Sequence, residues 1–203
     1  MKETIKNIFS FILACIVLIC AVSCGKGDDA NTTSGSDGAG DSGGYSDSLG
    51  LLDAIWDAYA DGEKFPACGG DESNLNFEGP GKYSVESAEM LDSSLGLPAS
   101  LASKIDSAAS LSHAMNANTF TCGAFRFKNA DDAVAAVSSV KTNILARHWI
   151  CGFPDSLLII TAPGNYVIAV WGIEKDTGVV STFKNKVMSA IEGSSVVVDE
   201  PIV

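Results

Sequence analysis

The sequence predicts an α+β domain: an antiparallel four-stranded sheet made of two strand-strand-helix units and packed with two N-terminal helices. Three observations predict this fold. An amphipathic segment follows a polar linker, two apolar hairpins occupy the C-terminal half, and a segment with helical periodicity follows each hairpin. The chain has 203 residues, and residues 49–203, which follow the linker, have the usual length of a single domain.

The first element of this domain is predicted to be an amphipathic helix. Large apolar side chains recur at helical spacing over Leu51–Tyr59, behind Ser48 as a possible N-cap, and Gly62 stands where the helix would stop. The following segment, residues 63–83, contains several glycines and prolines and shows no periodicity. We therefore expect a long loop there.

A second helix is expected from Ser84, which would cap it, to Leu95. Gly96 and Pro98 follow and are typical of a helix end. Residues 99–104 have the length of one further turn. These two helices would supply the N-terminal layer of the domain.

The rest of the chain reads as two similar units displaced by 46 positions, from 120 to 166. The apolar strand Phe120–Phe127 aligns with Tyr166–Ile173, and each unit continues into a helix, over 131–147 and 177–191. The turns that precede these strands are rich in residues that tolerate turn geometry: Asn116-Ala117-Asn118 and Ala162-Pro163-Gly164-Asn165. Few positions are identical, so two hairpins that are alike by coincidence remain an alternative.

In both strands of this repeat, the side chains that point to one face and those that point to the other are apolar. This predicts a sheet that is covered on both faces. The helices of the two units are expected to cover one face. The two N-terminal helices, or a partner, would cover the other.

The first residues have the features of an export signal. Lys2 and Lys6 precede a short apolar stretch, Ile8–Ala21, which is shorter than a membrane-spanning helix requires. The stretch ends in Ala21-Val22-Ser23-Cys24, followed at once by Gly25 and polar sequence. This ending resembles the lipobox of bacterial lipoproteins.

The lipobox resemblance implies that residues 1–23 are a signal peptide and that Cys24 becomes a lipidated N-terminus. The fatty acyl chains, such as palmitate, would then hold the protein at the extracytoplasmic face of the cell membrane, because two or more chains anchor firmly where one does not. The alternative is an ordinary secretory signal that leaves Cys24 as a free thiol.

The segment from the lipidated cysteine to the domain, residues 24–48, is rich in Gly, Ser and Asp and is predicted to be a flexible linker. The whole chain carries 13 basic and 25 acidic residues and a formal charge of −12. Such a charge disfavours nucleic acid as a partner and disfavours adhesion to anionic lipid through a basic patch. Membrane attachment is therefore expected through the lipid anchor alone.

The order of lipobox, acidic linker, helix and hairpins resembles a family of small lipoproteins of Gram-positive bacteria known only as a domain of unknown function. The likeness covers roughly Leu51–Ile191 and includes the hairpin Ala114–Phe127 and the motif Gly164-Asn165-Tyr166-Val167. Its motifs are hydrophobic patterns, so the resemblance implies a location and an architecture and carries over no active site.

Three cysteines remain after the predicted processing. Cys122 lies on a predicted central strand and is expected in the core. Cys68 and Cys151 lie in predicted loops, where a disulfide between them is possible outside the cell. Either of these two thiols would need a nearby base to act as a nucleophile, and the candidates are His113 and His148.

No motif for a metal, a nucleotide or a cofactor occurs in the sequence. The two histidines are far apart along the chain, and the acidic pair Asp131-Asp132 is explained by its place at the start of a predicted helix. We therefore predict no catalytic residue, no metal site and no cofactor.

Aromatic residues near the second hairpin are the one positive indication of a binding site. Trp149, Phe153, Tyr166 and Trp171 gather there, and most of them are expected in the core. Those that stand exposed around the turn at residues 151–154 would form a recognition patch.

Together these features predict a non-catalytic, lipid-anchored interaction module that binds a protein, a peptide or an envelope component. Two alternatives stay open. One is an extracytoplasmic enzyme of the thiol hydrolase type, and the other is a small solute-binding lipoprotein.

Overall fold

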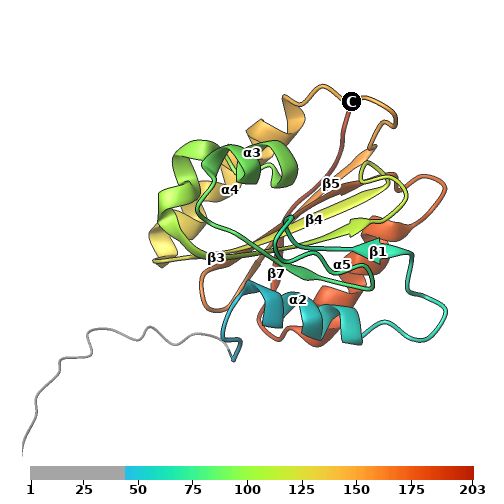
Figure 1. Ribbon diagram of the computed structural model, residues 1–203, viewed down its shortest axis with the longest axis horizontal. Coiled ribbons are helices and arrows are strands. Elements are labelled where there is room, and N and C mark those ends of the chain that lie inside the picture. Colours follow the sequence, from blue (N-terminus) through green and yellow to red (C-terminus); the bar gives the residue numbers. More distant parts are fainter. Residues whose placement is uncertain (1–43) are drawn as a thin grey trace, which may run out of the picture. The chain divides into compact units, whose positions relative to one another are not determined.

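A computed structural model describes residues 44–203; the predicted signal peptide, Cys24 and most of the predicted linker lie outside the described residues. The middle layer is an antiparallel sheet of seven strands in the order β1-β3-β4-β6-β5-β7, with β2 also paired to β3 (Figure 1). The strands are β1 (Ala67–Cys68), β2 (Gly81–Tyr83), β3 (Ile105–His113), β4 (Phe120–Phe127), β5 (Ser156–Ala162), β6 (Tyr166–Gly172) and β7 (Ser195–Pro201). The α+β class is confirmed, whereas the predicted number of four strands is wrong because three further strands extend both edges.

Helices cover both faces of this sheet (Figure 1). They are α2 (Ser48–Asp57), α3 (Ala88–Leu95), the 3₁₀ helix η1 (Ala99–Lys104), α4 (Ala130–Leu145) and α5 (Val179–Ala190). One apolar core cluster joins α2 and α5 to one face, and a second joins α3, η1 and α4 to the other. The expectation that the two unit helices, α4 and α5, share a face is therefore wrong.

The predicted repeat is visible in the sheet. β4 pairs with β6 in a register that places Gly123 opposite Ala169, and these two positions are 46 residues apart, the displacement seen in the sequence. The strand order β3-β4-β6-β5 consequently has an approximate two-fold axis at this central pair. The axis does not extend to the helices, because α4 and α5 lie on opposite faces.

The lengths of the connections account for this asymmetry. Only Lys128 and Asn129 separate β4 from α4, whereas six residues, 173–178, separate β6 from α5. Both faces of the strands are apolar, so either face can accept a helix, and the longer connection lets α5 pass to the face that α4 leaves open.

Local capping interactions begin three of the helices. The Asp47 carboxylate, rather than the predicted Ser48, accepts the N-terminal hydrogen bond of α2 from the Gly50 amide at 2.9 Å. Ser87 caps α3 and Asn129 caps α4 in the same way. These side chains satisfy amide groups that have no partner inside the helix.

The segment predicted as a long loop supplies β1 and β2, which both pair with β3. Gly69 and Gly81 permit this arrangement: a Cβ on Gly69 would lie 2.3 Å from the Ser110 carbonyl oxygen, and one on Gly81 would lie 2.4 Å from the Gly69 carbonyl. The glycines that favoured a loop in the sequence therefore allow two short strands to pack closely.

The last strand, β7, was not predicted either. It pairs with β5 at the sheet edge, and its side chains alternate between exposed and half-buried. The three consecutive valines at 196–198 are the β-branched signal that indicates a strand there.

Candidate functional site

The three described cysteines are free thiols, so the possible Cys68–Cys151 disulfide is not formed in this structure. Cys68 is held at the sheet edge by the pairing of β1 with β3, and Cys151 lies exposed in the loop before β5. Cys122 is completely buried on β4, as predicted, and burial raises the pKa of its thiol. Burial also raises the pKa of Cys68, which disfavours its thiolate.

The structure does not bring a cysteine and a histidine into a catalytic arrangement. Cys68 pairs with Ser112, so it projects from the opposite face of the sheet to His113, the next residue on β3. The His113 Nδ1 instead accepts a hydrogen bond from the Met115 amide at 3.3 Å, and the ring stacks on Phe65. Within residues 44–203, no hydrogen bond joins a thiol to an imidazole.

Of the four aromatic residues of the possible recognition patch, only Phe153 is strongly exposed. Tyr166 and Trp171 are buried, Tyr166 in the α2/α5 cluster and Trp171 in the α3/α4 cluster, because their strands are covered on both faces. Trp149 is half-buried against Trp171, with ring centroids 5.9 Å apart. Phe153 is 74 % exposed.

Two further residues that the sequence reasoning missed stand exposed on the same pair of joined loops as Phe153. They are Met115, in the loop between β3 and β4, and Ile150, in the loop between α4 and β5, with exposures of 82 % and 76 %. We call Met115, Ile150 and Phe153 the two-loop tip. Apolar side chains in connecting segments, which are usually polar, are the signal that points to them in the sequence.

Hydrogen bonds hold the two loops of the tip together. The Asn116 side-chain amide donates to the Cys151 carbonyl oxygen at 2.9 Å, and the Asn118 amide donates to those of Ile150 and Gly152 at 2.8 and 3.2 Å. Cys151 adopts a φ of 60°, a left-handed conformation that is uncommon outside glycine. The bonds from the asparagines hold this turn in place, so the exposed side chains project from a braced loop.

The tip also differs in charge from the rest of the protein. Its loops, residues 114–119 and 146–155, contain one acidic residue, Asp155, although the whole chain has 25. The Asp155 carboxylate accepts hydrogen bonds from the Glu174 and Lys175 amides at 2.6 and 3.2 Å. Arg147, in the second loop, donates to the main chain of α3, to Asp92 and Ser93. The tip is therefore an apolar area with few carboxylates on an acidic protein.

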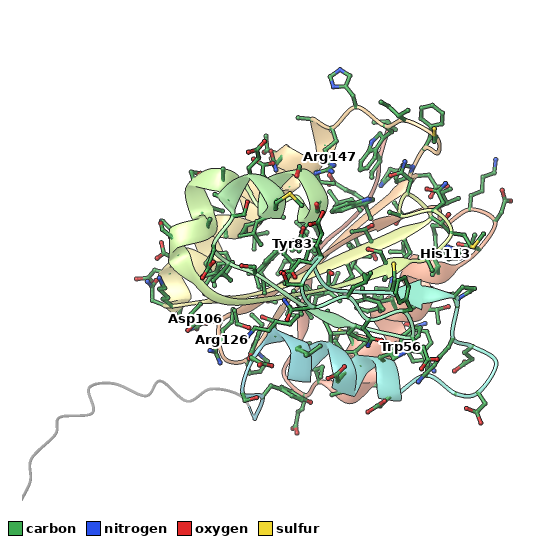
Figure 2. All side chains as sticks on the ribbon, in the orientation of Figure 1. Trp56, Tyr83, Asp106, His113, Arg126 and Arg147 are labelled. Atoms are coloured by element: carbon green, nitrogen blue, oxygen red, sulfur yellow. The ribbon has the colours of Figure 1, made fainter. Side chains whose placement is uncertain are left out.

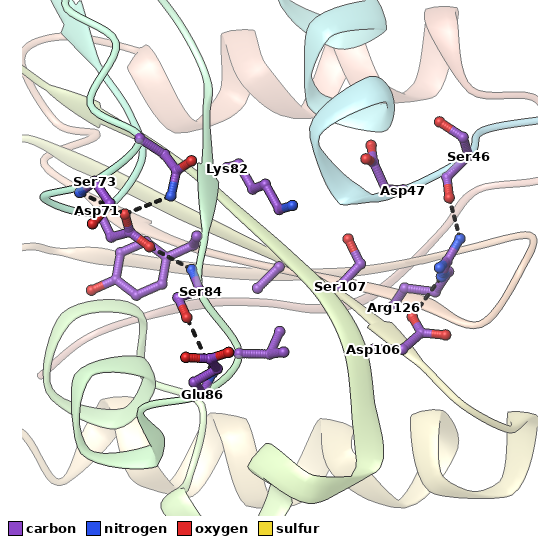
Figure 3. Close-up of a pocket in the computed structure, with 14 residues that line it drawn as sticks. Ser46, Asp47, Asp71, Ser73, Lys82, Ser84, Glu86, Asp106, Ser107 and Arg126 are labelled. Carbon is purple, nitrogen blue, oxygen red and sulfur yellow. Dashed lines mark hydrogen bonds and ion pairs between the residues drawn. The ribbon is translucent and has the colours of Figure 1, made fainter.

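A polar cleft of about 620 Å³ lies at the other end of the central strands (Figure 3). The start of α2, the segment after β2 and the start of β3 form its walls. Arg126, from β4, donates from Nε to Asp106 at 2.7 Å and from Nη1 to the Ser46 carbonyl oxygen. The bond to Ser46 attaches the entering chain to the sheet, and the ion pair with Asp106 joins β4 to β3.

Most of the charged groups of this cleft are satisfied within the fold. Partial burial would raise the pKa of Asp71, but hydrogen bonds from Asn74, Ser84 and Ser73 hold it below its ordinary value. Lys82 and Glu86 are the exceptions, because neither side chain has an ion-pair partner in the part of the chain that the structure describes. We read the cleft as a structural junction where the chain enters the domain.

No cluster of three or more metal-ligating side chains occurs among the described residues. None of the described helices is long and apolar enough to cross a membrane. The predicted lipidation site, Cys24, lies outside the described residues.

The structure thus offers a braced apolar tip at one end of its central strands and an internally paired polar junction at the other. Comparisons of the chain with protein-family models, with curated proteins and with solved structures gave no match.

Proposed function

We propose that this protein is a lipoprotein anchored through Cys24 at the extracytoplasmic face of the membrane, where its domain acts as a non-catalytic binding module. The lipobox-like Ala21-Val22-Ser23-Cys24 and the polar linker that follows support the anchor. The same order of features underlies the resemblance to the small Gram-positive lipoproteins.

The observation that carries the binding role is the two-loop tip. Three large apolar side chains, Met115, Ile150 and Phe153, are each more than 70 % exposed on adjacent loops. Leaving them in water is unfavourable, and the bonds from Asn116 and Asn118 reduce the entropy that would be lost when a partner binds. A braced, exposed apolar cluster is typical of a protein-binding surface.

The position of the tip suits an anchored protein. The first described residues contact the Arg126 and Tyr166 end of the central strands, since Ser46 and Tyr45 accept hydrogen bonds from these two side chains. The tip loops lead into the opposite end, at Phe120 and Ser156. Arg126 lies six positions after Phe120 on β4, which is about 20 Å in an extended strand.

A domain tethered at one end of its strands can present the other end away from the bilayer. The partner we propose is therefore another envelope protein with an apolar pocket. The one carboxylate of the tip loops, that of Asp155, is engaged by two main-chain amides, so an acidic partner, like this chain itself, meets little repulsion there.

The anchor is tested by Cys24→Ser in the producing cells. Fractionation should find the wild-type protein with the membranes and the variant in the soluble or secreted fraction. A variant that stays with the membranes would contradict lipid anchoring.

The tip is tested by a photo-crosslinking amino acid placed at Phe153, with Phe77 as the matched control. Phe77 is 73 % exposed, nearly the same as Phe153, but it stands beside Glu78 in an acidic loop. We expect one discrete adduct from position 153 in cells and none from position 77. Equal labelling at both positions, or none at either, would contradict the proposal.

The protein found in the adduct must then bind the purified wild-type chain directly. Met115→Ser and Ile150→Ser should each weaken this binding about tenfold, the loss of a well-buried apolar contact. Unchanged binding by both variants would show that the adduct arose from proximity alone.

A further inference from the structure

The sulfur-containing side chains of residues 44–203 differ strongly in their exposure to solvent. Met115 is 82 % exposed, whereas Met90 on α3 and Met188 on α5 are 43 % and 46 % exposed. Of the cysteines in this part of the chain, Cys151 is exposed, and the other two are buried or half-buried. The most exposed thioether and the most exposed thiol of the described residues therefore both lie on the loops of the two-loop tip.

Hydrogen bonds fix the main chain that carries Met115. Its amide donates to His113 Nδ1 at 3.3 Å, and the side-chain amide of the next residue, Asn116, donates to the Cys151 carbonyl oxygen at 2.9 Å. Figure 2 labels His113, the last residue of β3, which lies at the end of the strands away from Arg126. The sulfur of Met115 is thus presented to solvent from a braced loop.

A thioether in this position can react with a peroxide. One oxygen atom of the peroxide is transferred to the sulfur: an S–O bond forms as the O–O bond breaks, the sulfur is oxidised by two electrons, and the other oxygen leaves in a molecule of water. The product is methionine sulfoxide, which is polar and which methionine sulfoxide reductases convert back to methionine. The modification is therefore reversible.

Oxidation of Met115 would change the tip without disturbing the fold. Met115 belongs to neither of the two core clusters, so the sulfoxide remains in water in the free protein. In the apolar pocket of a partner, the sulfoxide oxygen would lose this water without gaining a hydrogen bond, which is unfavourable. Ile150 and Phe153 have no sulfur, so Met115 is the member of the tip on which a peroxide can act.

We infer that Met115 is an oxidation site that controls the two-loop tip: a peroxide converts its thioether to the sulfoxide, and the tip then releases its partner. This inference rests on the proposed protein-binding role and adds its regulation by an oxidant. Reduction of the sulfoxide would restore binding.

The test uses cells in which the photo-crosslinking amino acid stands at Phe153, with and without hydrogen peroxide. The peroxide concentration is raised until mass spectrometry finds sulfoxide on the chain. Met115 should be oxidised before Met90 and Met188, and the yield of the discrete adduct should then fall about tenfold, as expected for Met115→Ser.

Met115→Leu separates oxidation of this residue from the other effects of peroxide, because leucine is apolar and of similar volume but has no sulfur. Its adduct yield with peroxide should equal its own yield without peroxide. Met188→Leu is the matched control outside the tip, and Cys151→Ser removes the other exposed sulfur. Both of these variants should respond to peroxide as the wild type does.

The purified full chain gives a second measurement. Wild-type protein that is oxidised at Met115 should bind the protein found in the adduct about tenfold more weakly than reduced protein, and a methionine sulfoxide reductase should restore the affinity. This comparison needs no variant, so it decides the question even if Met115→Leu forms no adduct.

The possible failures are distinct. Absence of an adduct in untreated wild-type cells would contradict the protein-binding role itself. An adduct that persists once Met115 is oxidised, a Met115→Leu chain that still responds to peroxide, or a Cys151→Ser chain that no longer responds would overturn the oxidation site alone. Earlier oxidation of Met90 or Met188 would overturn it as well.

Discussion

The two ends of the central strands differ in whether their interacting groups find partners inside the fold. At the end where the chain enters, Arg126 bonds to Asp106 and to the main chain of Ser46, and Tyr166 bonds to the main chain of Tyr45. At the other end, the apolar side chains of the two-loop tip stand in water.

This difference separates a structural end from a binding end. A group that is satisfied within the fold contributes to stability, and removing it destabilises the protein. An exposed apolar side chain without an internal partner contributes little to stability and is available to a binding partner. Substitutions at the entry end should therefore change stability, and substitutions at the tip end should change binding.

The largest effect is expected for Tyr166→Ala. Tyr166 is completely buried among the residues between the sheet, α2 and α5, so its truncation should lower the free energy of unfolding by about 3 to 5 kcal/mol. Urea denaturation measures this loss. A value below about 1 kcal/mol, the range of surface substitutions, would mean that Tyr166 is exposed and belongs to a recognition patch after all.

Arg126→Met is expected to have the next largest effect. It keeps the apolar stem but removes the bonds to Asp106 and to the main chain, with an expected loss of about 1 to 2 kcal/mol after allowance for partial exposure to solvent. Hydrogen exchange should show faster opening of residues 45–50. If neither the free energy of unfolding nor the hydrogen exchange changes, the entry end does not have the structural role assigned to it.

Asn118→Ala should have a smaller and more local effect. The loss of its bonds to Ile150 and Gly152 should destabilise the loop by about 1 kcal/mol, seen as faster hydrogen exchange at residues 150–153. Binding of the tip partner should weaken because the exposed side chains are no longer braced. If the loop opens faster and binding stays the same, pre-organisation of the tip is not needed.

The smallest effect is expected for the loss of stability in acid. It is tested at two ion pairs, one near each end of the central strands. The hydrogen bond from Lys186 lowers the pKa of Glu63 from its ordinary 4.5, and that from Lys104 lowers the pKa of Asp132 from 3.8. Both pairs stabilise the fold above these ordinary values, and the contribution is lost as the pH falls through the lower folded-state pKa values.

Glu63→Gln and Asp132→Asn should therefore lose less stability than the wild type between neutral pH and about pH 3. Urea midpoints measured across this range check the prediction. A variant that is as acid-sensitive as the wild type would show that its ion pair contributes nothing measurable.

The strands and helices with strong periodicity are where sequence and structure agree. The 46-residue displacement places Gly123 opposite Ala169, and Cys122 lies in the core as its alternation with Phe120 and Ala124 indicates. The edge strands were missed because β1, β2 and β7 are short or half-exposed, and their pairing depends on neighbours that lie far away along the chain.

The candidate site was predicted only in part. Phe153 is exposed as the turn at residues 151–154 suggests, whereas Trp171 is buried under α3 and α4. Nothing in the spacing of Met115 and Ile150 shows that their loops meet. That contact depends on the side chains of Asn116 and Asn118 reaching across from one loop to the other.

The sequence by itself determined the local periodicities, the two hairpins and the apolar character of both strand faces, because these follow from the spacing of side chains along a helix or a strand. Only the tertiary structure decided which helix covers which face and which aromatics stay exposed. These depend on contacts between distant segments, where connection length and packing select among arrangements that the local pattern allows equally.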